Sequence, residues 1–245
     1  MSLFSIFYYL VLSFIYILAI PYLIFKSRNS KYRQAIPAKF FLKDNVPFKE
    51  NGIWFHSCSM GETKAIKPLI DNYLENANIS VITNTGFEEA KKISPNVRYL
   101  PFEIFLPFWV NKQKVLVVME AELWYLLFLL AKKKGAKTLL INARISDKSY
   151  KSYKRFSFFY KRIFQNIDKV FAQSEVDKHR LEELGASNVE VIGNIKLAQL
   201  PKVNVKLEKP EQVVITAAST HENEEKLVLN AYKKEQGKLI IVPRH

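Results

Sequence analysis

The sequence has a single cysteine, Cys58, and only seven glycines in 245 residues. One cysteine excludes a disulfide framework and a cysteine-rich zinc site, and it fits a reducing compartment. The four histidines lack the paired spacing of a zinc-binding helix. Neither the glycine-rich dinucleotide fingerprint nor the phosphate-binding P-loop occurs, which disfavours both classes of nucleotide enzyme. We therefore expect no metal site and no cofactor.

Charged side chains are absent from residues 2–25, where Leu, Ile, Phe, Tyr and Val predominate. About 20 such residues suffice to cross the hydrocarbon core of a bilayer, and the basic start and small-residue cleavage site of a signal peptide are missing. Residues 26–49 then contain seven basic side chains and one acidic one. By the positive-inside rule we expect residues 1–25 to be an uncleaved single-pass anchor, with the remainder in the cytoplasm. A buried apolar helix is the alternative.

The whole chain is basic, with 37 Lys and Arg against 23 Asp and Glu and a formal net charge of +14. Such a charge favours an anionic partner, which can be nucleic acid, anionic lipid or a phosphorylated small molecule. An anchored chain makes nucleic acid the poorest of these explanations. The aromatic residues interleaved with charge in Lys148–Arg162 more plausibly face the core or the membrane. We expect an anionic membrane surface as a partner and no nucleic acid.

Strand-like apolar runs alternate with helical patterns over residues 52–192. This alternation predicts a doubly wound α/β domain, which we assign to residues 26–200. The predicted strands are 52–58, 79–85, 97–100, 114–119, 137–142, 169–173 and 189–192. The predicted helices are 61–75, 88–93, 121–134, 152–165 and 175–184.

Residues 201–212 are polar and basic and are interpreted as a linker. After them the pattern restarts with a strand over 213–218, a helix over 221–234 and a strand over 238–242. So small a unit keeps too much of its surface in water to bury both faces of a sheet. We therefore expect residues 213–245 to be the start of a second α/β domain in a truncated chain.

Polar residues follow six of the predicted strands, at the edge where the ligands of parallel sheets bind. Glu62 lies three residues after Ser59, which fits a helix capping box, but it also fits a general base that a ligand reaches past Gly61. Glu120 and Glu122 flank the end of strand 114–119. No Ser or Asn cap explains this pair, although the helix dipole would favour Glu122. Other residues at strand ends are Arg144, Asn194, Lys196, Ser219, Thr220, His221 and Arg244.

Nine ordered segments resemble the Kdo (3-deoxy-D-manno-octulosonic acid) transferases, glycosyltransferase family 30, of Gram-negative lipopolysaccharide synthesis. They are His56–Glu62 (HSCSMGE), Thr83–Gly86 (TNTG), Leu100–Glu103 (LPFE), Met119–Trp124 (MEAELW), Ile141–Ser146 (INARIS), Ala172–Ser174 (AQS), Gly193–Lys196 (GNIK), Ser219–Glu222 (STHE) and Pro243–His245 (PRH). Glu103, Tyr125 and Asn223 stand where the family has Asp, Pro and Gly. The family's later Gly-Gly-His-Asn segment, which helps to bind CMP, lies beyond this chain.

The resemblance implies a two-domain GT-B glycosyltransferase at the cell inner membrane. It would transfer Kdo from CMP-Kdo to a lipid A precursor (lipid IVA), with inversion and without metal. Glu62 corresponds to the family's proposed base. The candidate acceptor-binding residues are Ser59, Gly61, Thr85, Glu120, Glu122, Arg144, Asn194 and Lys196. The candidate nucleotide-binding residues are Ser219, Thr220, His221 and Arg244. The alternatives are an anchored GT-B enzyme that uses a UDP-sugar, and an inactive acceptor-binding fragment.

Overall fold

The computed structural model describes residues 2–199, 208 and 210–244. The chain divides into two compact units, Met1–Leu200 and Pro201–His245, which are described separately below. The expected linker, 201–212, lies largely outside the described residues. The acceptor-binding role predicted for residues 26–200 and the nucleotide-binding role predicted for residues 213–245 stay predictions.

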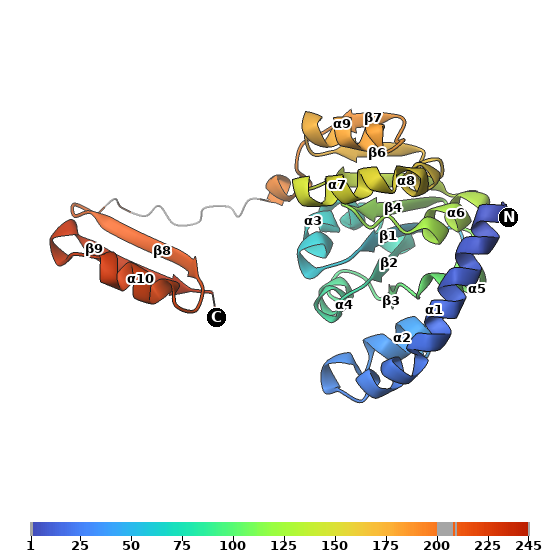
Figure 1. The fold of residues 1–245 in the computed structure, drawn as a ribbon, viewed down its shortest axis with the longest axis horizontal. Helices are drawn as coiled ribbons and strands as arrows, with labels where there is room; N and C mark the ends of the chain where they lie inside the picture. Colours follow the sequence, from blue (N-terminus) through green and yellow to red (C-terminus); the bar gives the residue numbers. More distant parts are fainter. Residues whose placement is uncertain (1, 200–207, 209, 245) are drawn as a thin grey trace. The chain divides into compact units, whose positions relative to one another are not determined.

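Seven parallel strands form the sheet of the first unit, in the order β3-β2-β1-β4-β5-β6-β7 (Figure 1). The strands are β1 (Ile53–Ser57), β2 (Ala77–Val81), β3 (Val97–Tyr99), β4 (Val115–Met119), β5 (Lys137–Ala143), β6 (Lys169–Ala172) and β7 (Val189–Val191). The chain runs from β1 to one edge and then returns to add β4 on the other side of β1. The strand order therefore reverses between β1 and β4, and ligands of open α/β sheets bind at such a switch point. The predicted doubly wound α/β fold is confirmed.

Both faces of this sheet are covered, because successive residues of a strand point to opposite sides. Trp54 of β1 belongs to one core cluster and Phe55 to the other, and their side chains are 1% and 3% exposed. One cluster includes residues of α5, α6, α8 and α9, and the other includes residues of α2, α3 and α4. The helices are α2 (Ala35–Phe41), α3 (Met60–Asp71), α4 (Asn84–Lys91), α5 (Leu106–Trp109), α6 (Tyr125–Lys133), α7 (Asp147–Arg155), α8 (Ser157–Phe164) and α9 (Glu175–Glu183).

Two predicted helices differ from the observed ones for local reasons. The helix predicted over 152–165 is two helices, α7 and α8, because Ser146 caps an earlier start and Phe156 leaves helical geometry at ψ 28°. The helix predicted over 121–134 begins only at Tyr125, because residues 120–124 form a loop in which Glu120 has a positive φ of 56°. The helix α2 was not predicted from the sequence.

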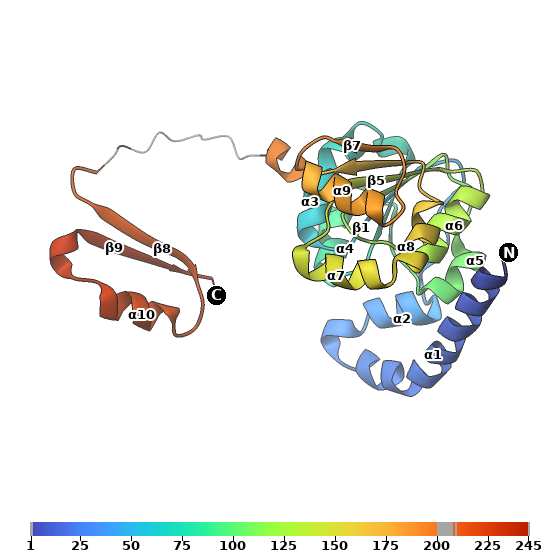
Figure 2. The same cartoon turned by 45° about the horizontal axis from the view of Figure 1, so that its top comes forward.

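The second unit contains a parallel pair of strands, β8 (Val214–Thr220) and β9 (Lys238–Pro243), joined through α10 (Glu224–Ala231) (Figure 2). This is the strand–helix–strand pattern predicted from the sequence. Several of its large apolar side chains are exposed, among them Leu227 and Leu229 of α10 and Val242 of β9. The short unit therefore buries little core of its own.

A long apolar helix, α1 (Leu3–Ser27), runs along the side of the first unit (Figures 1 and 2). It is long and apolar enough to cross a membrane. Tyr8 of α1 donates a hydrogen bond of 2.5 Å to Glu103, a carboxyl that is 3% exposed in the 3₁₀ helix η3 (Glu103–Phe105). The other oxygen of Glu103 accepts from the backbone N–H of Leu126 at 2.6 Å. Glu103 therefore joins α1 to the first turn of α6.

We predict that Glu103 makes stability depend on pH. Burial raises the pKa of this carboxyl to about 7, although hydrogen bonds from Tyr8 and the first turn of α6 act in the opposite direction. The folded chain then holds the Glu103 proton more tightly than the unfolded chain, so stability falls as pH rises. Between about pH 4.5 and pH 7 the loss should reach about 3 kcal/mol.

Urea unfolding in mild detergent across this pH range measures the effect. Glu103→Gln keeps an acceptor for Leu126 and removes the titration, so its unfolding free energy should change much less with pH. A variant with the same pH slope as the parent would contradict this role of Glu103.

Candidate functional site

The loops after β1 and β4 meet at the switch point of the sheet, because these strands are neighbours in parallel register, with Ile53 opposite Val115. Residues 58–62 follow β1 and open α3, and residues 120–124 follow β4 and precede α6. Each loop carries acidic side chains, Glu62 on the first and Glu120 and Glu122 on the second. The expected meeting of these carboxylates at one edge of the sheet is therefore observed.

Glu62 makes the contacts of a helix cap. Its Oε2 accepts from the backbone N–H of Cys58 at 2.7 Å, and its Oε1 accepts from the Ser59 hydroxyl at 3.0 Å. Ser59 is the N-cap of α3 and accepts from the Glu62 N–H at 3.4 Å. Burial raises the pKa of Glu62; the two donors oppose this shift, and the nearby charges of Glu120 and Glu122 add to it. Glu62 is thus a buried cap that also lies in a group of three carboxylates.

Glu122 is contacted by Trp124 of its own loop and by His56 and Cys58 from β1 and the loop after it. The indole N–H of Trp124 donates to its Oε2 at 2.7 Å, and His56 Nε2 lies 3.7 Å from the same oxygen. Burial raises the pKa of Glu122, but the nearby His56 and the hydrogen bonds from Trp124 and the Cys58 thiol outweigh this effect and lower it. Glu122 is therefore kept ionised more readily than Glu62.

His56 is fully buried, and its Nε2 is a buried atom without a hydrogen-bond partner among the described residues. Its Nδ1 lies 2.8 Å from the Ser80 hydroxyl, which accepts from the Trp54 indole N–H at 2.7 Å. The backbone carbonyl of Ser80, which can only accept, also lies 3.1 Å from Nδ1. Ser80 therefore fixes the ring of His56 through Nδ1 and leaves Nε2 facing Glu122.

Glu120 is paired with a lysine from the segment that follows the edge strand β7. Lys196 Nζ, on the 3₁₀ helix η4 (Ile195–Gln199), lies 2.5 Å from Glu120 Oε1. The Asn142 amide donates to the same oxygen at 3.4 Å and accepts from the backbone N–H of Ile195 at 3.1 Å. Asn142 therefore ties the end of β5 to both the Glu120 loop and η4.

Two glycines beside these carboxylates have opposite surroundings. A Cβ on Gly61 would meet only the Ser59 hydroxyl, at 4.0 Å, so the space above the first turn of α3 is open. A Cβ on Gly86 would meet backbone atoms, Cys58 O at 3.2 Å and Ser59 C at 3.3 Å. Gly86 therefore allows α4 to pack against the β1 loop, whereas Gly61 leaves room for a ligand.

The remaining candidates of the first unit lie around this group. Thr85 is in the first turn of α4, with its hydroxyl 3.4 Å from that of Thr83, the N-cap, which donates to Cys58 O. Asn194 caps the turn before Lys196, accepting from the Lys196 N–H at 3.0 Å. Arg144 follows β5 with an exposed side chain, and among the described residues it forms no hydrogen bond or ion pair. The candidates of the first unit therefore lie near one another. Unlike Thr85 and Asn194, Arg144 has no such contact with the described residues.

The four candidates of the second unit lie together at the ends of β8 and β9. Arg244 Nη1 is 3.2 Å from His221 Nε2, and the backbone N–H of Arg244 donates to Thr220 O. The Thr220 hydroxyl donates to Glu225 at 2.6 Å. Ser219 has a positive φ of 62°, at a break in the register of the two strands. The four residues thus lie close together, and their role in binding a nucleotide stays a prediction.

Sequence reasoning missed the side chains that hold the carboxylates. His56, Trp124 and Asn142 lie within the motif segments but are not among the predicted site residues, and neither is Cys58. Burial raises the pKa of the Cys58 thiol to about 12, and the charges of Glu122 and Glu62 add to this shift. The available signal was positional, because His56, Cys58 and Asn142 lie in the last residues of predicted strands; Trp124 falls within the predicted helix 121–134 and had no such signal.

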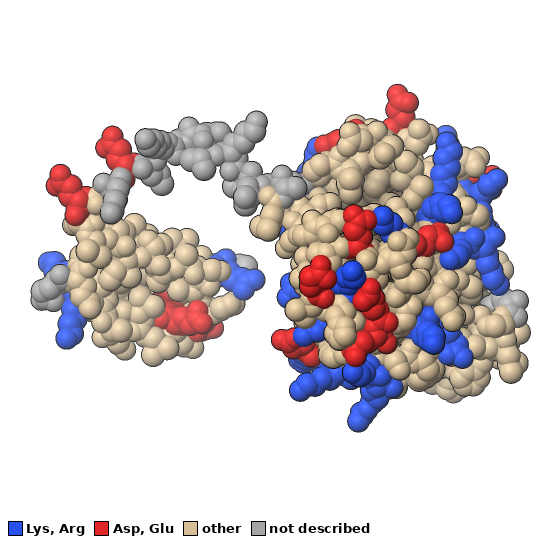
Figure 3. Space-filling model, turned by 90° about the horizontal axis from the view of Figure 1, so that it is seen from above, with Lys and Arg blue, Asp and Glu red and all other residues tan. Residues whose placement is uncertain are grey.

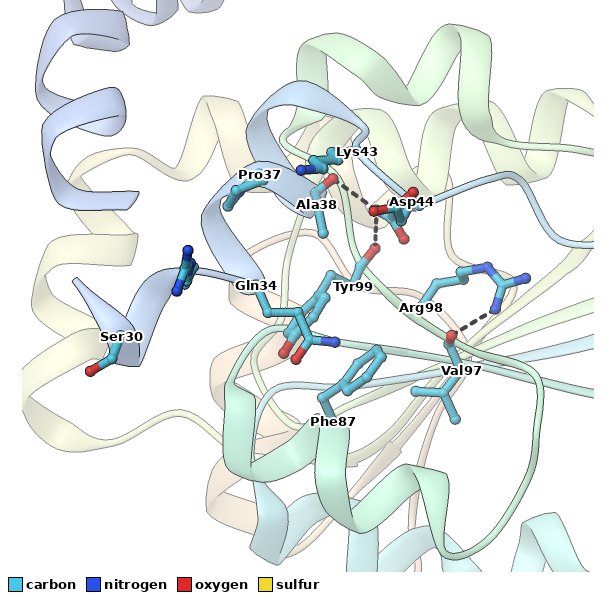
Figure 4. A pocket seen from close by; sticks show the side chains of 12 residues that line it. Ser30, Gln34, Pro37, Ala38, Lys43, Asp44, Phe87, Val97, Arg98 and Tyr99 are labelled. Carbon is cyan, nitrogen blue, oxygen red and sulfur yellow. Dashed lines mark hydrogen bonds between the residues drawn. The ribbon is translucent and has the colours of Figure 1, made fainter. Parts of the chain in front are cut away.

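Two hollows lie near α2. One, of about 350 Å³, is lined by Arg33, Lys43, Asp44 and Arg98 among others, and the Asn45 amide donates beside it to Ala38 and Tyr99 carbonyls (Figure 4). It lies at the β3 edge, separated from the carboxylates by β2.

The second hollow, of about 140 Å³, is lined by Lys39, Phe40, Ile82, Leu100, Pro101, Phe102 and Trp124. It adjoins the carboxylate group, because Trp124 donates to Glu122. Burial lowers the pKa of Lys39, and the nearby Cys58 opposes this shift.

Figure 3 looks onto the side of the first unit that carries α9 and β7. Acidic side chains lie among the basic ones on this face, and one acidic group occupies its middle. The face shows no single basic track of the kind that follows a nucleic acid backbone. The excess positive charge of the chain therefore does not gather here.

A doubly wound parallel sheet with carboxylates at its switch point defines a ligand-binding α/β domain. Comparison with known proteins identifies the family to which this domain belongs. Residues 28–199 match the family model described as 3-deoxy-D-manno-octulosonic-acid transferase (kdotransferase), and the chain belongs to this family.

Curated relatives include a bifunctional glycosyltransferase/methyltransferase of Fusobacterium nucleatum, 34% identical over 80% of this chain and 34% of that protein. The 3-deoxy-D-manno-octulosonic acid transferase of Rickettsia felis is 34% identical over 79% of this chain and 47% of its own length. That of Haemophilus influenzae is 26% identical over 96% of this chain and 60% of its own length. The chain thus spans about half the length of the curated relatives it matches.

We predict opposite effects on stability for the two glycines at the site. Gly61→Ala should raise the free energy of unfolding by about 0.5–1 kcal/mol, because alanine is favoured within a helix and the new methyl group meets open space. Gly86→Ala should lower it, because the methyl group would press on the backbone of the β1 loop. Urea unfolding of the two variants beside the parent measures both changes. A Gly61→Ala variant less stable than Gly86→Ala would contradict the geometry described here.

Proposed function

We propose that this chain forms the acceptor-binding part, and the start of the nucleotide-binding part, of an enzyme that transfers Kdo from CMP-Kdo to a lipid A precursor such as lipid IVA. The observation that carries the proposal is the group of three carboxylates at the switch point, with Gly61 leaving open space beside Glu62. A sugar hydroxyl is a weak nucleophile, and a carboxylate placed beside it can accept its proton.

In the proposed reaction the acceptor hydroxyl attacks the anomeric carbon of Kdo as its proton passes to Glu62. The bond from that carbon to the phosphate oxygen of CMP breaks, and CMP leaves with the electron pair. A single displacement of this kind inverts the anomeric centre, and none of these steps requires a metal ion. The raised pKa of Glu62 suits a base, because it brings the affinity for a proton closer to that needed near neutral pH.

The other two carboxylates have different proposed roles. Glu122 is held ionised by its donors, so it holds a proton less well than Glu62 and is better suited to orienting the acceptor. Glu120 is bound by Lys196, and this pair is proposed to accept and donate hydrogen bonds to the acceptor sugar. Ser59, Thr85, Arg144 and Asn194 complete the proposed acceptor site.

Ser219, Thr220, His221 and Arg244 are proposed to bind the nucleotide. Arg244 and His221 supply donors for phosphate, and their proximity supports a shared ligand. The proposed location is the cytoplasmic face of the cell inner membrane, because α1 is apolar and the basic residues after it suit anionic headgroups. A UDP-sugar donor, or acceptor binding without transfer, remains the alternative.

We expect Glu62→Gln, in the full protein that contains this chain, to lower turnover with CMP-Kdo by about 10²–10⁴-fold. The glutamine amide keeps most of the capping hydrogen bonds but cannot accept the proton of the acceptor hydroxyl. Thr83→Ala is the matched control, because it removes the N-cap hydroxyl of the neighbouring helix α4, at about 1 kcal/mol of stability, and lies outside the proposed site. Turnover and urea unfolding of both variants separate a catalytic role from a capping one.

Turnover of Glu62→Gln within about tenfold of the parent would contradict the base assignment. Activity with a UDP-sugar in place of CMP-Kdo would identify the other donor class. Binding of lipid A precursor without turnover in the parent would identify an acceptor-binding fragment.

A further inference from the structure

The helix α1 runs along the side of the first unit (Figure 2), with Ser5 and Leu23 buried and further positions on one face partly buried. The partly or fully buried positions recur at three- and four-residue intervals, which is the spacing of one helix face. They are Phe4, Ser5, Tyr8, Tyr9, Leu12, Ser13, Tyr16, Ala19, Ile20, Leu23, Lys26 and Ser27. At 1.5 Å per residue this docked face is about 34 Å long, which is the full length of an apolar helix that could span a bilayer.

Polar contacts fix α1 to three parts of the α/β domain. The Ser5 hydroxyl lies 2.8 Å from the Tyr125 hydroxyl of α6, and Tyr8 donates to Glu103 of η3. Tyr9 donates to the Ile104 carbonyl at 3.0 Å, and Tyr16 donates to the Phe40 carbonyl of α2 at 2.6 Å. A helix held in this way cannot leave the domain without breaking these bonds.

The surface to which α1 is fixed carries charge. Glu103 is ionisable, the Arg162 guanidinium lies 4.4 Å from the centre of the Phe4 ring, and Lys133 lines a hollow beside Ser2 and Phe4. If α1 crossed the bilayer, this surface would enter the hydrocarbon core with it. Ionisable groups at that depth are costly, and an α/β domain would leave loop backbone there without partners. The charge of this surface therefore disfavours a crossing position for the docked helix.

The opposite face of α1 is apolar and exposed. It presents Leu3, Ile6, Phe7, Leu10, Val11, Phe14, Ile15, Ile17, Leu18, Tyr22, Ile24 and Phe25. This face continues onto α8, because Phe4, Phe7, Tyr8 and Val11 share an apolar groove of about 370 Å³ with Phe156, Phe158, Phe159 and Tyr160. Lys26, Arg28, Lys31 and Arg33 follow at the end of the helix. An apolar surface bordered by cations suits the acyl chains and anionic headgroups of one leaflet.

We propose that α1 lies in the plane of the membrane within a single leaflet, with its inner face docked on the α/β domain and its outer face among the acyl chains. Both ends of α1 then lie on the same side of the bilayer as the domain. The sequence alone predicts a single-pass anchor. Length and apolarity do not distinguish a helix that crosses a membrane from one that lies along its surface.

This placement also brings lipid close to the carboxylates, a consequence that depends on the proposed function. Tyr16 of α1 contacts Phe40 and the Phe102 ring, and both of these residues line the 140 Å³ hollow with Trp124. Trp124 in turn donates to Glu122. A lipid-borne acceptor would then reach the site from the leaflet in which α1 lies.

Single cysteines test the placement in a Cys58→Ser chain, and the readout does not depend on activity. Ser2→Cys and Arg28→Cys mark the two ends of α1. We expect a membrane-impermeant maleimide to label both in inverted inner-membrane vesicles, and neither in right-side-out spheroplasts. A crossing helix would expose only Arg28→Cys in the inverted vesicles. Labelling of Ser2→Cys in spheroplasts would overturn the proposal.

Depth along the helix gives a second readout in vesicles of phosphatidylethanolamine and phosphatidylglycerol. Leu3, Leu10, Ile17 and Ile24 lie seven residues apart on the exposed face, and each is replaced by a cysteine carrying a fluorophore. Lipids with nitroxides at the headgroup or along the chain should quench all four to the same shallow depth. Ser13→Cys, on the docked face, is the control and should be quenched least. Quenching that is deepest at the middle positions would overturn the proposal. The absence of quenching in a dimeric protein would also overturn it, because a second copy would then cover this face.

Discussion

The site depends on one electrostatic constraint, which is that three carboxylates share the switch point of a parallel sheet. Ionised groups this close repel one another, and burial penalises each further. The fold meets this constraint with a different set of donors for each. Glu62 accepts from a backbone N–H and a hydroxyl, Glu122 accepts from the Trp124 indole, and Glu120 pairs with a lysine. The pKa of Glu62 is raised and that of Glu122 is lowered, so these two carboxylates can serve different roles.

The same constraint explains why the loops around the site have unusual backbone geometry. Glu120 and Asn142 both have positive φ values, 56° and 53°, directly at the ends of neighbouring strands. Extended geometry would carry each side chain along its strand, whereas the turn directs Glu120 toward Lys196 and Asn142 toward η4. Local strain at a binding edge is typical of functional sites.

Much of this arrangement could be predicted from the sequence, because it follows from pattern. The apolar run of β4 and the acidic residues after it place Glu120 and Glu122 at a strand end, and parallel strands end at one edge. The donors could not be predicted in the same way. His56 reaches Glu122 only because β1 lies beside β4, and its orientation depends on Ser80 of β2. Lys196 comes from η4, which follows the edge strand β7.

The helix α1 shows a similar limit. Its composition predicts a membrane helix, and Ser5, Tyr8 and Tyr16 are too few to mark a polar face in an otherwise apolar sequence. Only the folded chain shows that these residues meet the domain. Glu103 illustrates the coupling, because one carboxyl accepts from Tyr8 of α1 and from the first turn of α6, which directly follows the loop of Glu122.

The alkylation rate of Cys58 tests the central claim most directly, because this thiol is the natural reporter of the carboxylate group. An ordinary thiol becomes reactive near about pH 8.5. Burial and the charges of Glu122 and Glu62 raise the pKa of Cys58 to about 12, so iodoacetamide should react slowly with the folded protein at pH 9 and beyond. Glu122→Gln should shift the reactivity to lower pH. A parent whose Cys58 titrates near the ordinary value, or a Glu122→Gln profile identical to that of the parent, would contradict the account.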